Sequence, residues 1–140
     1  MKQRINLLTL GVNDLKNAMK FYQKGMGWHT KGIVGAEHEN GAVVLFELDN
    51  GVMFCLYERK HLAWDSQLSL QTASATEFSI GYFVNSEKEV DAIMEQAKKA
   101  GATITKPAQS AFWGGYHGYF QDLDGHLWEI GYNPSWKIEE

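Results

Sequence analysis

The sequence predicts an α+β fold in which two βαβββ halves form a single domain spanning residues 1–140. Two repeated patterns support this prediction. A strand–turn–helix pattern occurs twice, with Val12-Asn13 matched by Val84-Asn85 at a spacing of 72, and a hairpin glycine recurs at Gly51 and Gly125 with a spacing of 74. The composition, 44% hydrophobic and 21% charged, is ordinary for a globular chain that is long enough to bury a core.

The first half, about residues 1–58, opens with the apolar run 5–12, which predicts a strand. Asn13 or Asp14 supplies the N-cap of a helix that ends near Gly25 and Gly27. Three strand-like runs follow, at residues 28–34, 42–48 and 52–58. Asp49-Asn50-Gly51 between the last two runs is typical of a hairpin turn.

The second half, about residues 76–135, repeats this order. A strand at 78–84 precedes Ser86 and Glu89, which form the S-x-x-E pattern of a capping box. The helix that follows ends at Gly101, and three more strands are expected, at residues 102–105, 115–121 and 126–132. Residues 59–75, which join the halves, mix polar and apolar residues and predict a partly helical connector.

Charge and cysteine content exclude several functions. The net charge of −4 and the pI of about 5.7 argue against nucleic-acid binding and against attachment to an anionic membrane surface. No run approaches the roughly 18 apolar residues of a membrane span. Cys55 is the single cysteine, so no disulfide framework forms, and we expect a cytoplasmic protein.

Two stretches resemble the vicinal-oxygen-chelate superfamily, which includes glyoxalases, bleomycin-resistance proteins and extradiol dioxygenases. They are LTLGVNDLKNAMKFYQKGMGW and GGYHGYFQDLDGHLWEIGYNP, although Leu123 stands where the family's closing turn usually has proline. The resemblance implies an eight-stranded, cup-shaped mixed sheet with helices outside and the active site inside the cup. Many members of the family are dimers, so a homodimer is expected.

Metal-dependent members of this family carry one ligand on each of the first, fourth, fifth and eighth strands. The opening motif and the two repeat spacings place these positions at Leu7, Cys55, Ser79 and Glu129. Leucine offers no ligand atom and serine is a poor neutral ligand, whereas a catalytic metal site needs about three protein ligands. The resemblance therefore implies a degenerate metal site, and we expect no metal and no other cofactor.

Several residues are candidates for contacts with a ligand inside the cup. Glu129 lies between Trp128 and Ile130, so it faces the cavity if its neighbours face the helices, and it could orient a ligand or act as a general base. His117 has two possible positions, in the pocket or exposed on the other face of its strand. The further candidates for pocket walls or ligand contacts are Leu7, Cys55, Tyr57, Ser79, Trp113 and Tyr116.

These observations favour a protein that holds an unknown small organic molecule in an aromatic-lined cup without performing chemistry. The alternative is a cofactor-free isomerase or lyase that uses Glu129 as its general base. A metal-dependent glyoxalase or dioxygenase is a third possibility, against which the inferred ligand set argues.

Overall fold

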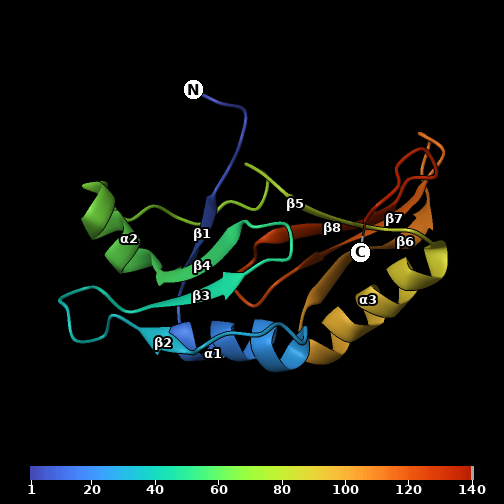
Figure 1. The fold of residues 1–140 in the computed structure, drawn as a ribbon. Helices are drawn as coiled ribbons and strands as arrows, with labels where there is room; N and C mark the ends of the chain where they lie inside the picture. The colour runs from blue at the N-terminus through green and yellow to red at the C-terminus, as the bar shows by residue number, and fades with distance from the viewer. Residues whose placement is uncertain (140) are drawn as a thin grey trace. The chain divides into compact units, whose positions relative to one another are not determined.

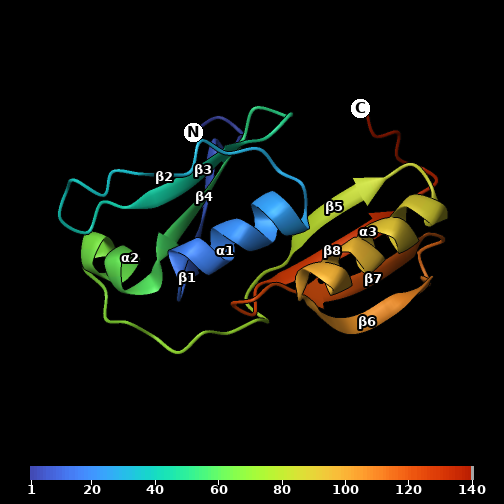
Figure 2. The ribbon, with the colours of Figure 1, turned by 90° about the horizontal axis from the view of Figure 1, so that it is seen from below.

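The computed structural model describes residues 1–139 and divides the chain into two compact units. The first unit ends at Thr72 and the second begins at Ala73, so the division falls inside the predicted connector 59–75. Figures 1 and 2 show the elements of both units. No helix within residues 1–139 is long and apolar enough to cross a membrane.

The first unit contains a four-stranded mixed sheet in the order β1-β4-β3-β2. β1 pairs with β4 in parallel, and the other two pairs are antiparallel. Asp14 caps α1 by accepting a hydrogen bond from the Asn17 nitrogen at 2.8 Å, and the π-helical turn η1 continues the helix. The elements are β1 (Leu7–Val12), α1 (Leu15–Lys20), η1 (Phe21–Gly25), β2 (Ile33–Val34), β3 (Val43–Glu47), β4 (Met53–Glu58) and the connector helix α2 (Arg59–Ser66).

The second unit repeats the arrangement, with the sheet order β5-β8-β7-β6. Ser86 caps α3 as predicted: its hydroxyl accepts from the Glu89 nitrogen and donates to the Glu89 carboxylate at 2.6 Å. α3 lies along one face of this sheet (Figure 2). The elements are β5 (Ile80–Val84), α3 (Glu87–Ala100), β6 (Thr103–Ser110), β7 (Tyr116–Gln121) and β8 (Leu127–Tyr132).

Strand pairing confirms both repeat spacings. Leu8 of β1 pairs with Phe54 of β4, and Ile80 of β5 pairs with Trp128 of β8. The first members of these pairs are 72 residues apart and the second members are 74 apart, as the sequence predicted. The α+β fold with two βαβββ repeats is therefore confirmed, and its eight strands form two four-stranded sheets.

Each unit has its own apolar core between helix and sheet. In the first unit the rings of Tyr22, Trp28, Phe46 and Phe54 contact one another, with centroids 5.0–6.1 Å apart. In the second unit Phe120 and Trp128 stack at 6.0 Å. The other buried apolar side chains of the second unit are Val84, Val90, Met94, Ala97 and Ile130.

Two predicted strands have different bounds in the structure. The run 28–34 pairs only at Ile33–Val34, because Trp28 turns into the core and the Thr30 hydroxyl donates to the Leu45 carbonyl at 2.7 Å. The run 102–105 continues to Ser110. Pro107 is tolerated there because β6 is an edge strand, where a missing N–H need not interrupt the ladder.

Gly118 on β7 allows α3 and the backbone of β6 to lie close to the backbone of β7. A Cβ at this position would lie 2.8 Å from Met94 Cε and 2.9 Å from two backbone atoms, Lys106 O and Ala108 N. We therefore expect Gly118→Ala to lower the free energy of unfolding by about 1–3 kcal/mol, because backbone atoms cannot swing aside as a side chain can. Urea denaturation followed by circular dichroism measures this change.

Gly81→Ala is the matched control for this substitution. Its added Cβ would meet only ring atoms of Phe83, at 3.4 and 3.7 Å. Equal denaturation midpoints for the two variants would contradict the close approach at Gly118.

Candidate functional site

One face of the second sheet is covered by α3, and the opposite face carries polar side chains. Trp128 and Ile130 of β8 are buried on the α3 face, and Glu129 between them points the other way because side chains alternate along a strand. Residues paired directly across the sheet share a face. The face opposite α3, called here the Glu129 face, therefore presents Gly81, Phe83, His117, Tyr119, Glu129 and Gly131.

Glu129 accepts hydrogen bonds from two side chains of β7. His117 Nδ1 lies 2.8 Å from Glu129 Oε1, and the Tyr119 hydroxyl also bonds the carboxylate. The His117 and Glu129 side chains are only 9% and 20% exposed. Burial raises the pKa of Tyr119, and the negative charge of Glu129 and the hydrogen bond to it raise this pKa further. Tyr119 thus remains a neutral donor toward Glu129.

A β-bulge brings Lys106 onto the same face. Ile104 pairs with Phe120 on the α3 side, but the next pair is Lys106 with Tyr119, so Thr105 is an extra residue on β6. Such an insertion interrupts the alternation and turns the following side chain to the other face. As a result, Lys106 Nζ lies 3.3 Å from His117 Nε2.

The polar network adjoins an open hollow and an aromatic edge. The hollow has a volume of about 430 Å³, and Ser79, Tyr119 and Leu127 line it together with residues of the segment that precedes β5. On the other side of His117, the Trp113 ring lies 5.3 Å from the imidazole. Phe83 lies over Gly131 and contacts Trp136, which is 54% exposed.

The sequence-predicted residues of the second unit divide between the two faces. Ser79 borders the hollow, and Glu129, His117 and Trp113 lie together. Of the two positions considered for His117, exposure to solvent is wrong, because the residue is 7% exposed and bonded to Glu129. Tyr116 does not belong with the pocket walls: it lies on the α3 face and donates to Asp91 Oδ1 at 2.7 Å.

In the first unit, Leu7, Cys55 and Tyr57 share the sheet face opposite α1. Leu7 is half exposed. Cys55 is 5% exposed, and burial raises the pKa of its thiol, although a hydrogen bond with Thr9 acts in the opposite direction. The Tyr57 hydroxyl donates to the Asn40 carbonyl at 2.5 Å.

The residues at the four family ligand positions do not fit a family-type metal site. Leu7 has no donor atom, and the buried Cys55 thiol favours its protonated form, whereas a metal binds the thiolate. Ser79 supplies only a neutral hydroxyl. Glu129 is a suitable ligand, but its Oε1 already accepts from His117. One carboxylate is not enough for a catalytic metal site.

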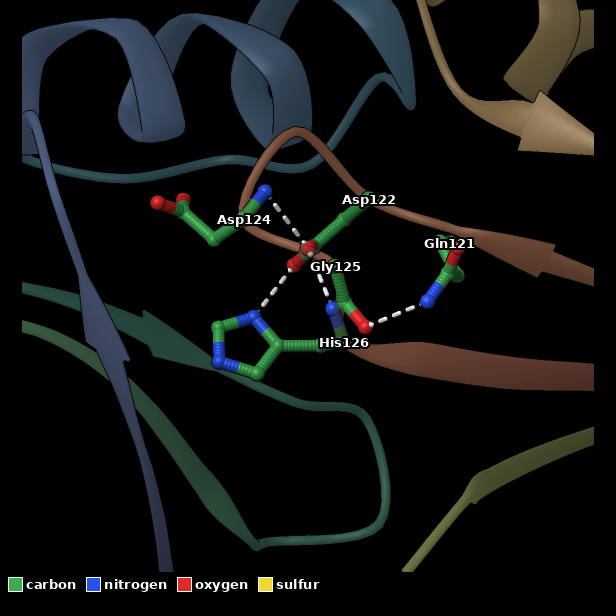
Figure 3. Close-up of polar contacts among 5 residues, drawn as sticks. All are labelled: Gln121, Asp122, Asp124, Gly125 and His126. Carbon is green, nitrogen blue, oxygen red and sulfur yellow. Dashed lines mark hydrogen bonds and ion pairs between the residues drawn. The ribbon is translucent and has the colours of Figure 1, made fainter. Parts of the chain in front are cut away.

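A second acidic group, not identified from the sequence, lies in the turn between β7 and β8. Asp122, Asp124 and His126 are the one group of three or more His, Cys, Asp or Glu side chains within residues 1–139 whose ligand atoms all lie within 4.8 Å of one another. Asp122 Oδ1 accepts from the backbone nitrogens of Asp124 and His126, both at 2.9 Å, and Asp122 Oδ2 lies 2.8 Å from His126 Nδ1 (Figure 3). Both carboxylate oxygens of Asp122 therefore stabilise the turn through hydrogen bonds. The His126 ring is half-buried against Asp122.

Comparisons with known proteins agree with this architecture. The model of the Glyoxalase/Bleomycin resistance protein/Dioxygenase superfamily matches residues 4–130. A glyoxalase-related enzyme from Fulvimarina pelagi is 30% identical, with a TM-score of 0.85, over 99% of this chain and 94% of that one. A hypothetical protein from S. aureus is 29% identical with a TM-score of 0.77, and a genomically encoded fosfomycin resistance protein from Listeria monocytogenes is 26% identical with a TM-score of 0.69; each match covers 95% of both chains. The curated proteins give no match.

Divalent metals should stabilise this protein very little. A site that binds only the folded state adds about 2.7 kcal/mol at a hundredfold excess of metal over its Kd. At roughly 2–4 °C per kcal/mol or slightly more, such a site would raise the Tm by several degrees. We expect Zn²⁺, Ni²⁺, Mn²⁺ and Fe²⁺ at micromolar concentration each to shift the Tm by less than about 2 °C in differential scanning fluorimetry.

If a metal shifts the Tm by more than this, two variants identify where the metal binds. Asp124→Asn removes a candidate ligand from the turn but keeps its backbone N–H, and Glu129→Gln removes the one family-type ligand. A stabilisation that either substitution abolishes would show that a metal binds at the corresponding site.

The ionisation of Tyr119 should respond to Glu129. Glu129→Gln removes the carboxylate charge, so the pKa of Tyr119 should fall toward its usual value while the contribution of burial remains. Because the folded-state pKa is raised, this tyrosine favours folding at pH below about 10 and loses that contribution as the pH rises through its folded pKa. The ¹³Cζ shifts of labelled tyrosines, followed against pH, measure both effects.

Tyr116 is the internal control for this titration. The hydrogen bond to Asp91 is the main cause that raises its pKa, followed by burial and by the charges of Asp91 and Glu87. Asp91→Asn should lower the pKa of Tyr116 alone. A Tyr119 titration that Glu129→Gln leaves unchanged would contradict the Tyr119–Glu129 contact.

Proposed function

Because the chain belongs to the glyoxalase/bleomycin resistance protein/dioxygenase superfamily, we propose that it binds a small organic molecule on the Glu129 face of its second unit, without a family-type metal ion. The observation that carries this proposal is the polar network of Lys106, His117, Glu129 and Tyr119 beside the hollow. Small-molecule sites combine an apolar wall with a few convergent polar groups, and this face has both.

The first unit is an internal control for the structural importance of this network. At the spacing of 74, Glu129 corresponds to Cys55, Tyr119 to Leu45 and His117 to Val43. The first unit therefore builds the same sheet with no charged side chain at these three positions. Because the fold forms without the network, its presence in the second unit supports a role in recognition rather than in folding.

The chemistry of the face restricts the ligand. An ionised carboxylate only accepts hydrogen bonds, so the ligand group that meets Glu129 is a donor such as a hydroxyl or an amine. Phe83, Trp113 and Trp136 offer ring surface for an apolar or planar part of the ligand. In the first unit, Leu7, Cys55 and Tyr57 lie on the equivalent face and remain proposed ligand contacts.

Acid–base catalysis is the second candidate function, and the 2.8 Å contact between His117 and Glu129 favours it. A carboxylate held by two donors is fixed in direction and can take a proton from a bound ligand. Returning that proton to a neighbouring atom of the ligand would complete an isomerisation with no cofactor. Elimination of a leaving group after proton removal would instead make the protein a lyase.

Glu129→Gln tests both functions. The matched control is Glu95→Gln, which removes an exposed carboxylate from α3. Small hydroxy and amino compounds are the first probes, because they carry the donors that the Glu129 carboxylate accepts, followed by any compound that mass spectrometry detects in the purified protein. We expect Glu129→Gln to weaken binding about 10- to 100-fold in calorimetry, because a hydrogen bond to a charged group contributes about 1.5–3 kcal/mol.

The same variants separate binding from catalysis. If Glu129 is a base, the wild-type protein exchanges a ligand proton with deuterated solvent, and Glu129→Gln abolishes that exchange while retaining residual binding. If the protein only binds its ligand, neither form catalyses exchange. Equal affinities of wild type, Glu129→Gln and Glu95→Gln for a bound compound would remove Glu129 from the site.

A further inference from the structure

Lys106, His117 and Glu129 form a chain of hydrogen bonds, and the chemistry of the side chains decides which atom donates and which accepts. A lysine ammonium has three N–H donors and no acceptor. At 3.3 Å from Lys106 Nζ, His117 Nε2 must therefore be the accepting nitrogen that carries no proton. The single ring proton of a neutral imidazole then sits on Nδ1, which donates to Glu129 Oε1 at 2.8 Å.

We propose that Lys106 is a positioning residue that holds His117 as a neutral imidazole with its proton on Nδ1, so that Glu129 and not His117 meets the ligand. The inference rests on the proposed function in one respect, the use of the Glu129 face as the ligand site. The arrangement itself belongs to the ligand-free protein, so it can be tested independently of any ligand.

Two aromatic rings also fix the orientation of the His117 ring. The rings of Trp113 and Tyr119 lie 5.3 and 5.4 Å from the imidazole, at steep angles of 86° and 65°. These rings set the plane of the imidazole, and the Tyr119 hydroxyl is directed to Glu129. The charged groups in contact with His117 are Lys106 from β6 and Glu129 from β8, one on each ring nitrogen.

Both ring nitrogens are therefore engaged within the protein. A histidine in this state presents neither a bare nitrogen nor an N–H to a ligand. Glu129 keeps lone pairs with which it can accept hydrogen bonds from a ligand. Because Lys106 holds the Nε2 side of the imidazole, the hydrogen bond from Nδ1–H keeps the Glu129 carboxylate in one orientation. The β-bulge at Thr105 is essential to this role, because without the extra residue Lys106 would share the α3 face with Ile104.

The test is the tautomer of His117 in the ligand-free protein. Long-range ¹H–¹⁵N spectra of the ¹⁵N-labelled protein distinguish a protonated from a bare ring nitrogen, and His117→Gln assigns the signals by their loss. From the contacts of the two ring nitrogens we expect a protonated Nδ1 and a bare Nε2. A protonated Nε2 in the wild-type protein would overturn the proposal without any variant.

Charge-changing variants separate a positioning role from a merely structural one. Lys106→Arg keeps a donor-only side chain and should preserve the wild-type tautomer. Lys106→Glu places an acceptor at Nε2, so Nε2 should become a protonated donor toward it. Lys98→Glu, an exposed charge reversal on α3, should leave His117 unchanged. The proposal is overturned if Lys106→Arg alters the tautomer, if folded Lys106→Glu keeps a bare Nε2, or if Lys98→Glu produces the same change as Lys106→Glu.

Discussion

The alternation of side chains along β8 is the constraint on which the second unit depends. Trp128 and Ile130 must face α3 to complete its apolar core, and the geometry of a strand then directs Glu129 to the opposite face. A slip of one residue would exchange the faces, exposing a tryptophan and burying a carboxylate against the helix. The apolar core and the polar network are therefore fixed by the same register, and neither can change without the other.

The features that are local in sequence could be predicted from the sequence. The two repeat spacings follow from short motifs that carry their own physical signals, namely helix caps and hairpin glycines, and strand pairing reproduces both spacings. The Ser86–Glu89 capping box has the same basis, because its contacts lie within a single turn of helix. The direction of Glu129 could be inferred because both of its neighbours are large and apolar.

The rest of the site depends on contacts between strands, which local patterns do not contain. Alternation alone would place Lys106 beside Ile104, and only the bulge brings it to His117, although Pro107 within a strand was a signal of irregularity. Tyr116 is an aromatic residue of the kind that lines pockets. The alternation of side chains along β7 places it on the α3 face, where it bonds Asp91. The role of Asp122 as the anchor of its turn depends on two backbone nitrogens that composition does not reveal.

The two repeats differ in chemistry although they share a topology. The family's metal ligands, as the resemblance implies, come from strands of both repeats, whereas Lys106, His117, Tyr119 and Glu129 all come from the three consecutive strands of one repeat. A catalytic metal site needs about three protein ligands, and the residues at the other three positions, Leu7, Cys55 and Ser79, do not fit as partners of Glu129. Neighbouring strands supply new partners at hydrogen-bond distance, because positions paired across a sheet are brought together by the backbone ladder itself. Glu129 is thus paired on a half-buried face, with its direction set by strands of one repeat alone.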